Sequence, residues 1–166
     1  MIINHETALK TLRRMTHEIL EKNDDVANIV LVGILKKGLP IALLIRDNIK
    51  QYAGIEVPVV ELDISMHRDD EKRRPATQPD FAVGNKVCIL VDDVLFTGRT
   101  ARAAMDAIVD LGRPKRIEFA VLIDRGHREL PIRADYVGKN APTALDETVI
   151  VNLSGINAGV YIERIR

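Results

Sequence analysis

Tryptophan is absent from this sequence, cysteine occurs once, and aromatic residues make up only 4% of the chain. With Cys88 alone, an intrachain disulfide and a cysteine-based metal site are both excluded. No apolar run approaches the roughly 18 residues that a membrane-spanning helix needs, and the N-terminus carries no apolar signal region. These absences predict an aliphatic core that includes Cys88, a reducing cytoplasmic location and no membrane partner.

An excess of either charge is also missing, because 24 Lys and Arg residues balance 24 Asp and Glu residues. Balanced charge gives no sign of nucleic-acid binding, but it does not exclude it, since a separate basic face matters more than the sum. The chain has 166 residues, of which 46% are hydrophobic, and it shows no internal repeat or linker. We therefore expect one domain over residues 1–166.

The apolar pattern predicts helices that alternate with strands. An N-terminal helix is indicated by a stripe at helical spacing, formed by Ala8, Leu9, Leu12, Met15 and Ile19. Further helices are expected at residues 39–52 and 98–111, and strands at residues 28–32, 57–62, 87–91, 117–123, 134–137, 148–153 and 160–162. This order predicts an α/β fold with a mostly parallel twisted sheet, helices on both faces and a small strand-rich C-terminal addition.

Residues 88–100 form the most informative segment. Four apolar residues from Cys88 to Val91 predict a buried strand that ends at two carboxylates, Asp92 and Asp93, before the loop 97–100 opens a helix. Backbone N–H groups and the helix dipole at such a helix start attract a phosphate, and Gly98 lets the backbone approach it closely. The two carboxylates are suited to accept hydrogen bonds from ribose hydroxyls, directly or through a divalent cation.

Three other polar segments accompany this one. The loop 33–38 also joins a strand to a helix, and its Lys36 and Lys37 should emerge at the same sheet edge as the carboxylates, where they would hold pyrophosphate oxygens. Read alone, a basic turn between glycines is more often just a solvated turn. Residues 67–80 are charged and contain proline, which favours an exposed loop that could act as a lid. An Arg-rich run follows the strand predicted at residues 117–123.

Residues 88–100 resemble the phosphoribosyl-pyrophosphate (PRPP) motif of the type I phosphoribosyltransferases. The run from Arg125 to Tyr136 narrows the resemblance to the PyrR family, which it matches over nearly the whole chain. That family implies a uracil phosphoribosyltransferase, which converts uracil and PRPP to UMP and pyrophosphate with Mg²⁺. It also implies an attenuation regulator that responds to UMP or UTP and binds a hairpin in the leader mRNA of pyrimidine biosynthesis genes.

The resemblance assigns roles to residues of this chain. Catalytic roles fall on Asp92, Asp93, Lys36 and Lys37, and the two aspartates are also the candidate Mg²⁺ ligands besides PRPP itself. A flap over about residues 64–82 would include Arg68 and Asp69. Binding of PRPP or UMP falls on Gly38, Val94, Leu95, Phe96, Thr97, Gly98, Arg99, Thr100 and Arg125.

An RNA-facing surface is implied as well, together with a homodimer or higher homo-oligomer that would align two copies of it. Its residues in this chain are Arg14, His17, Lys22, His127, Arg128 and Arg133. Arg14 and His17 also lie on the polar face of the predicted first helix, which supports the assignment independently of the resemblance. A helix face that is merely exposed to solvent would show the same pattern of polar residues.

The chain departs from the family pattern in three places. Lys36 and Lys37 stand where Thr and Arg are usual, His67 replaces a Tyr in a shorter flap, and Arg13 replaces a Thr on the RNA-facing helix. Lysine binds phosphate as a point charge and lacks the bidentate fork of arginine. Two alternatives therefore stay open: an RNA regulator with vestigial transferase activity, and a purine-type phosphoribosyltransferase with no RNA role.

Overall fold

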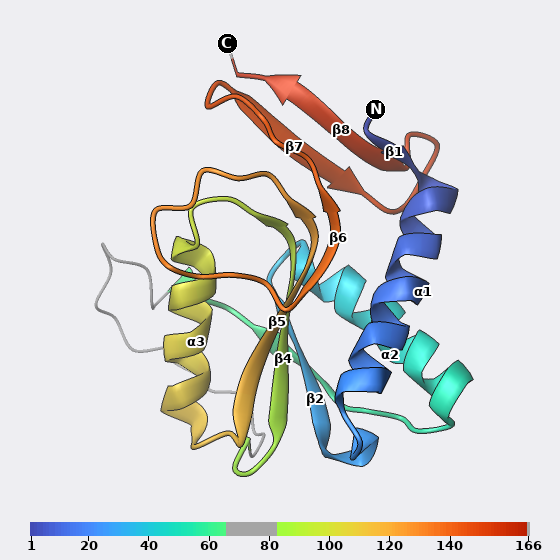
Figure 1. Cartoon of the computed structure of the whole chain (residues 1–166), viewed down its shortest axis with the longest axis vertical. Coiled ribbons are helices and arrows are strands. Elements are labelled where there is room, and N and C mark those ends of the chain that lie inside the picture. The colour runs from blue at the N-terminus through green and yellow to red at the C-terminus, as the bar shows by residue number, and fades with distance from the viewer. Residues whose placement is uncertain (66–82, 166) are drawn as a thin grey trace.

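The computed structural model describes residues 1–65 and 83–165, which form two sheets and three α-helices (Figure 1). The elements are β1 (Ile3–Asn4), α1 (His5–Lys22), a 3₁₀ turn (Val26–Asn28), β2 (Ile29–Ile34), α2 (Gly38–Ala53), β3 (Val59–Leu62), β4 (Val87–Leu95), α3 (Arg99–Leu111), β5 (Arg116–Asp124), β6 (Tyr136–Asn140), β7 (Glu147–Asn152) and β8 (Gly159–Arg164). The predicted order of helices and strands is confirmed.

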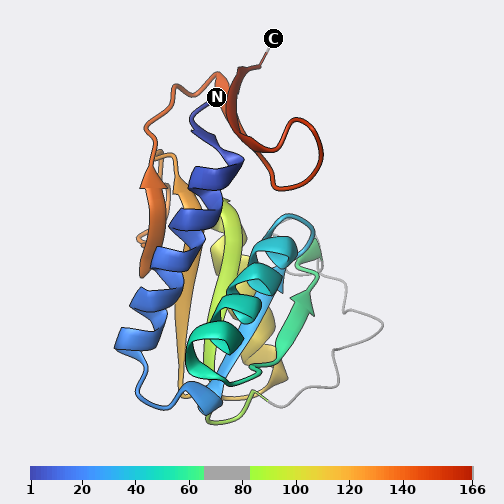
Figure 2. The same ribbon diagram turned by 90° about the vertical axis from the view of Figure 1, so that its right-hand side faces the viewer.

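The larger sheet is parallel throughout, in the order β3-β2-β4-β5-β6, with β4 at its centre. Helices α1 and α2 cover one face and α3 the other (Figures 1 and 2). Side chains along β4 alternate between these layers: Ile89 and Val91 join the core beneath α1 and α2, whereas Cys88 and Leu90 join the core beneath α3. Burial on both faces explains why this strand reads as an unbroken apolar run.

Cys88 is fully buried, as predicted, and burial raises the pKa of its thiol to about 11. The inward faces of α2 and α3 follow the sequence pattern closely but not completely. Ala42, Ile45 and Ile49 of α2, which lie at helical spacing in the sequence, are buried. In α3, the same spacing predicts that Ala101, Met105 and Ile108 face inward, but Met105 is only half-buried. The buried residues of this helix are Ala101, Ala103, Ala104, Ala107 and Ile108.

The smaller sheet is antiparallel, in the order β1-β8-β7, and confirms the predicted C-terminal addition, called the hood here. It lies beyond the carboxyl ends of β4 and β5, beside the start of α1 (Figure 1). The two-residue strand β1 was not predicted, because two residues carry no periodicity; Ile3 pairs with Val160 of β8. The hood therefore ties the N-terminus of the chain to its C-terminal hairpin.

The strand boundary predicted at the candidate site is wrong. Strand β4 does not end at Asp92 but continues to Leu95, and Asp92 and Val94 pair with Val121 and Ile123 of β5. The carboxylates suggested a strand end because charged groups are rare inside sheets. The apolar pair Val94 and Leu95 continues the ladder past them instead. The flap residues Arg68 and Asp69, and His67, lie outside the described residues.

Candidate functional site

Asp92 and Asp93 lie near the C-terminal end of the central strand β4, at the edge of the sheet that faces the hood. Asp92 is buried and Asp93 half-buried. One oxygen of each accepts a hydrogen bond from the next backbone N–H: Asp92 Oδ1 from Asp93 N and Asp93 Oδ1 from Val94 N, both at 2.8 Å. These bonds orient both carboxylates.

The predicted phosphate loop, residues 97–100, follows β4 in the chain. Residues 96–98 connect β4 to α3, and Gly98, at a φ of 93°, stands at the N-terminal cap position of α3. A glycine there provides the left-handed conformation at little cost and offers no side chain to the first-turn N–H groups. Thr97 Oγ1 accepts a bond from Arg99 N at 3.2 Å, and Arg99 Nε pairs with Glu129 at 2.9 Å. Thr97 to Thr100 thus lie at a helix N-terminus, the geometry that attracts a phosphate.

The predicted pyrophosphate loop lies against the same strand. Lys36 and Lys37, both exposed, stand in the short connection between β2 and α2, after a cis peptide bond from Leu35 to Lys36. A Cβ on Gly38 would fall 2.2 Å from the carbonyl oxygen of Val91 and 3.1 Å from the Asp92 Cα. Only a glycine permits this approach, which brings the start of α2 directly beside the carboxylates. Lys37 Nζ donates a bond to the hood, at Val151 O, over 3.3 Å.

Arg125 lies where β5 ends, but its guanidinium is turned into the protein. The residue is only 5% exposed. Its Nε donates to Thr143 Oγ1 at 2.8 Å, its terminal nitrogen donates to Ala144 O and Glu147 O, and the guanidinium lies over the Phe96 ring at 3.9 Å. Burial lowers the pKa of Arg125, an effect that the nearby Glu147 partly opposes. The contacts join the phosphate loop to the segment that leads into β7.

The predicted RNA-facing residues of α1 are held against the edge strand β6. Arg14 pairs with Glu18 and donates to the carbonyl oxygens of Val137 and Gly138. Lys22 Nζ lies 3.3 Å from Asp135 Oδ1, just before β6 begins. His17 packs against Tyr52 of α2, with ring centroids 4.4 Å apart.

The other three predicted residues lie on the connection between β5 and β6, and all three are exposed. His127 adopts a φ of 67°; its Nε2 contacts Thr143 O, and its ring meets Phe96 edge-on at 5.8 Å. Arg128 lies 3.7 Å from Asp124. Arg133 precedes Asp135, the partner of Lys22, so this one connection reaches both the phosphate loop and the end of α1.

The structure reveals a buried polar network near the ends of this connection that no sequence pattern indicated. Glu118 is 2% exposed and accepts bonds from Tyr136 OH at 2.7 Å, Asn23 Nδ2 at 3.1 Å and Arg116 Nε at 3.2 Å. Lys22 lies 3.8 Å away. The network joins the end of α1 to the starts of β5 and β6.

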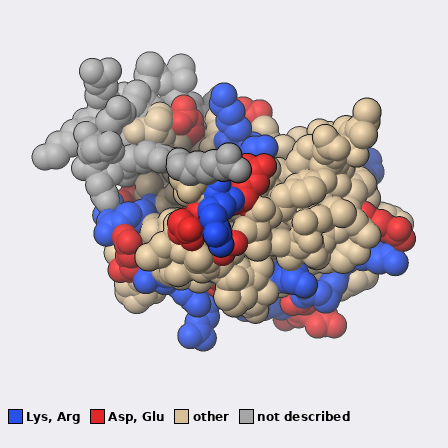
Figure 3. Space-filling model, turned by 90° about the horizontal axis from the view of Figure 1, so that it is seen from above, with Lys and Arg blue, Asp and Glu red and all other residues tan. Residues whose placement is uncertain are grey.

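Charges of both signs lie side by side on the face seen from above (Figure 3). Among the described residues, no group of three or more His, Cys, Asp or Glu side chains could hold a metal ion. Asp92 and Asp93 are oxygen donors of the kind that Mg²⁺ prefers, but a pair of them supplies only part of its six ligands. These residues fit an ion that takes its other ligands from a bound phosphate compound and water. Within the part of the chain that the structure describes, no helix is long and apolar enough to cross a membrane.

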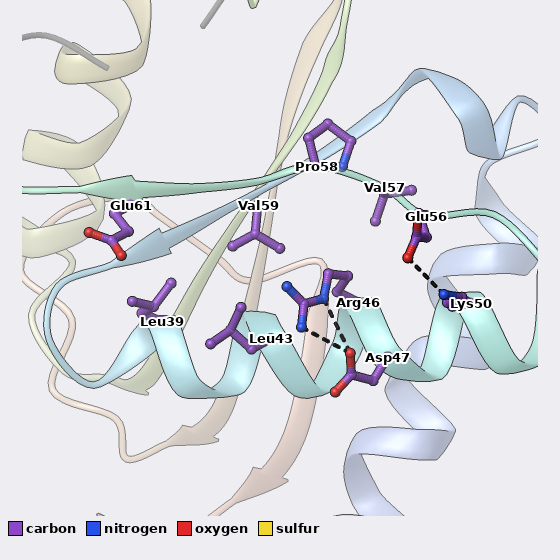
Figure 4. A pocket seen from close by; sticks show the side chains of 10 residues that line it. All are labelled: Leu39, Leu43, Arg46, Asp47, Lys50, Glu56, Val57, Pro58, Val59 and Glu61. Atoms are coloured by element: carbon purple, nitrogen blue, oxygen red, sulfur yellow. Dashed lines mark hydrogen bonds and ion pairs between the residues drawn. The ribbon is translucent and has the colours of Figure 1, made fainter. Parts of the chain in front are cut away.

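Two grooves flank the outer face of α2. One, of about 760 Å³, lies between α2 and β3, where Leu39, Leu43 and Val59 are ringed by charged side chains that include the pairs Arg46–Asp47 and Lys50–Glu56 (Figure 4). The other, of about 350 Å³, lies between α2 and the hood. Leu43 and Asp47 line both, so the two form one grooved surface along α2.

Comparison with known proteins gives a consistent result. The family model described as "Phosphoribosyl transferase domain" matches residues 1–152. The bifunctional protein PyrR of Ligilactobacillus salivarius is 52% identical over 162 residues, which cover 93% of this chain and 91% of that protein. The bifunctional protein PyrR of Caldicellulosiruptor saccharolyticus is 55% identical over 148 residues, or 86% and 81% of the two chains.

Solved structures match in fold. The hypoxanthine phosphoribosyltransferase of Trypanosoma cruzi has a TM-score of 0.77 at 18% identity and covers 100% of this chain and 97% of its own. That of Staphylococcus aureus has a TM-score of 0.75 at 21% identity, with 99% and 90% covered. At these identities the likeness is one of fold and does not extend to the choice of base.

Proposed function

Because the chain belongs to the phosphoribosyl transferase domain family and, within it, to the PyrR family, we propose that it has two activities. It transfers phosphoribose from PRPP to uracil, giving UMP and pyrophosphate. It also binds the leader mRNA hairpin of pyrimidine genes in response to UMP or UTP. A cytoplasmic location, where PRPP and mRNA are available, is part of this proposal.

The approach of Gly38 to Val91 is the observation that carries the transferase proposal. It sets the pyrophosphate loop beside Asp92, at the same sheet edge as the phosphate loop. PRPP carries a pyrophosphate on C1′ and a phosphate on C5′ of one ribose, so its binding site needs two anion-binding loops on either side of groups that bind hydroxyls. Two loops flanking a pair of carboxylates meet that need.

In the proposed reaction the bond between C1′ and the pyrophosphate oxygen breaks, a bond from C1′ to N1 of uracil forms, and the N1 proton is released. Asp92 and Asp93 bind the ribose hydroxyls and favour positive charge on the sugar. Lys36 and Lys37 stabilise the departing pyrophosphate, and residues 97–100 bind the 5′-phosphate, with Val94 and Phe96 beside the ribose and Leu95 buried in the core beneath α3. Bound Mg²⁺ would neutralise further charge on pyrophosphate. Positioning and charge stabilisation thus supply the catalysis.

The RNA-binding proposal is supported by exposure and placement. Arg14, His17 and Lys22 on α1, and His127, Arg128 and Arg133 on the connection after β5, are all exposed. The connection after β5 leads into β6, and α1 is held beside the start of that strand by the contacts of Arg14 with Val137 and of Lys22 with Asp135. Cationic side chains there would neutralise phosphates, and histidine would stack on unpaired bases of a loop.

We also propose a homodimer that buries the grooved surface of α2. An apolar strip ringed by paired charges of both signs suits a second copy of the same surface, because a two-fold interface must be complementary to itself. The surface also reaches Lys37, so an interface there lies close to the pyrophosphate loop.

A UMP-forming assay with uracil, PRPP and Mg²⁺ tests the transferase activity, with hypoxanthine, guanine and orotate as alternative bases. Turnover specific for uracil is the expected result and would show that Lys36 and Lys37 are tolerated. Turnover with a purine would instead favour the purine-type alternative. If the folded protein binds UMP but turns over none of the four bases, the transferase proposal is wrong and an RNA regulator with a vestigial site is left.

A further inference from the structure

Arg125 makes a set of contacts that a ligand-binding arginine would not need. Three hydrogen bonds from its guanidinium go to one short segment, at Thr143 Oγ1, Ala144 O and Glu147 O. The face of the guanidinium lies over Phe96, and only 5% of the residue is exposed. Three of the five guanidinium N–H donors are used in this way and the group is buried, which suits a residue that acts through its neighbours.

Thr143 is the point at which these contacts reach the RNA-facing residues. Its side chain accepts the bond from Arg125 Nε, its N–H donates to Arg125 O at 3.3 Å, and its own carbonyl oxygen contacts Nε2 of His127. The ring of His127 also meets the edge of Phe96. Phe96, Arg125, Thr143 and His127 therefore form a closed circuit of contacts, in which none can shift without moving another.

The circuit is fastened to the phosphate loop. Phe96 precedes Thr97, and the carbonyl oxygen of Thr97 accepts bonds from the N–H groups of Glu129 and Leu130, at 2.9 and 3.3 Å. The segment that carries His127 and Arg128 is thus bonded to the loop predicted to bind the nucleotide phosphate on one side and to Thr143 on the other. A phosphate bound at residues 97–100 would act on both attachments.

We propose that Arg125 is a positioning residue that couples nucleotide occupancy to the position of His127 on the RNA-facing segment. The inference rests on the proposed function and deepens it by naming the route of regulation. Coupling of this kind is reciprocal, so the nucleotide raises RNA affinity by the same factor as RNA raises nucleotide affinity. The proposal requires a second arrangement of these stacked and hydrogen-bonded contacts, favoured when a phosphate lies against the loop.

The test follows the His127 ring by NMR while UMP is added, with its signals assigned by loss in His127→Gln. In the wild-type protein we expect UMP to shift these signals and to raise the affinity for the pyrimidine leader hairpin RNA about fivefold or more. Thr143→Val removes only the hydroxyl that Arg125 Nε uses. In this variant we expect unchanged UMP affinity, no response of the His127 signals to UMP, and equal RNA affinity with and without UMP.

Two control variants show whether a lost response is due to the missing Thr143 hydroxyl or to the substitution of a threonine by valine in general. Thr143→Ser restores the hydroxyl and should restore the response, whereas Thr148→Val makes the same change in β7 and should behave as wild type. If Thr143→Val binds UMP and its His127 signals and RNA affinity still respond, the inference is wrong. The same holds if UMP binds the wild-type protein without moving the His127 signals. A response of His127 in a protein that binds no hairpin RNA would support the coupling and contradict the RNA-binding half of the proposed function.

Discussion

Asp93 is the residue on which the proposed chemistry depends most directly. It is half-buried at the end of β4, and its backbone-bonded oxygen fixes its orientation. Asp93→Asn keeps the size and the acceptor but removes the negative charge that favours a cationic sugar. We expect kcat for UMP formation to fall by about 100-fold or more, as when a single electrostatic contact to a transition state is removed.

Steady-state kinetics with uracil and PRPP measure this effect. The exposed Asp24 provides a control, since Asp24→Asn makes the same change at the opposite end of the sheet from Asp93 and should leave kcat within about twofold. Normal kinetics in Asp93→Asn would contradict the assigned role.

Gly38 leads to a second prediction at this scale. Gly38→Ala would place a methyl group 2.2 Å from the Val91 carbonyl oxygen, so the start of α2 must move away from β4. We expect a loss of stability of about 1–3 kcal/mol, typical of overpacking, and weaker PRPP binding because the two loops separate.

Urea unfolding and calorimetric titration with PRPP measure the two effects. Gly84→Ala is the matched control, because a Cβ on Gly84 would meet nothing within 4 Å. Equal stability and PRPP affinity in the two variants would show that the close approach of α2 is unimportant.

At the scale of helices and strands, the spacing of apolar residues was enough to predict α2, which buries one face, and β4, which is buried on both. The inward positions of α2 and the apolar run of β4 were predictable because burial alone decides them. The extension of β4 past Asp92 was not, because pairing with Val121 and Ile123 across the sheet outweighs the local preference of carboxylates for loops.

The candidate site likewise has parts that the sequence predicts and parts that only the fold brings together. The phosphate loop was readable because Thr97, Gly98 and the helix start are contiguous in the chain. The place of Arg125 was not, because its partners Thr143, Ala144 and Glu147 come from a later segment that only the fold brings near. The close approach of Gly38 to Val91 likewise depends on how α2 packs against β4.

The network around Glu118 gives a prediction at the scale of elements, because it joins α1, β5 and β6. Glu118→Gln removes a buried charge that accepts bonds from Tyr136, Asn23 and Arg116. We expect a loss of about 1–3 kcal/mol in the free energy of unfolding, the cost of leaving buried partners unmatched.

Urea unfolding of Glu118→Gln is compared with that of Glu21→Gln, an exposed position on α1 where we expect a change within about 0.5 kcal/mol. Hydrogen exchange should also accelerate at the end of α1 in the Glu118 variant. An unchanged unfolding midpoint would mean that the network does not hold these elements together.

For the whole molecule, three surfaces divide the proposed tasks. The sheet edge beneath the hood takes the small ligands, the connection after β5 together with α1 takes RNA, and the outer face of α2 is left for a second copy. The first two surfaces share residues through Phe96 and His127, whereas α2 meets the ligand site only at Lys37. Dimer formation should therefore be separable from RNA binding by substitution.

Leu43→Glu tests whether the dimer forms through α2, since Leu43 lines both grooves on that helix. A buried, unpaired carboxylate on each side of a two-fold interface is costly, so we expect the dimer dissociation constant to rise by at least about 100-fold. Sedimentation equilibrium measures it, with circular dichroism to verify the monomer fold. Val109→Glu on the outer face of α3, where the residue is 60% exposed, makes the same change away from the grooves and should leave the assembly intact. Dissociation caused by Val109→Glu, and not by Leu43→Glu, would move the interface from α2 to α3.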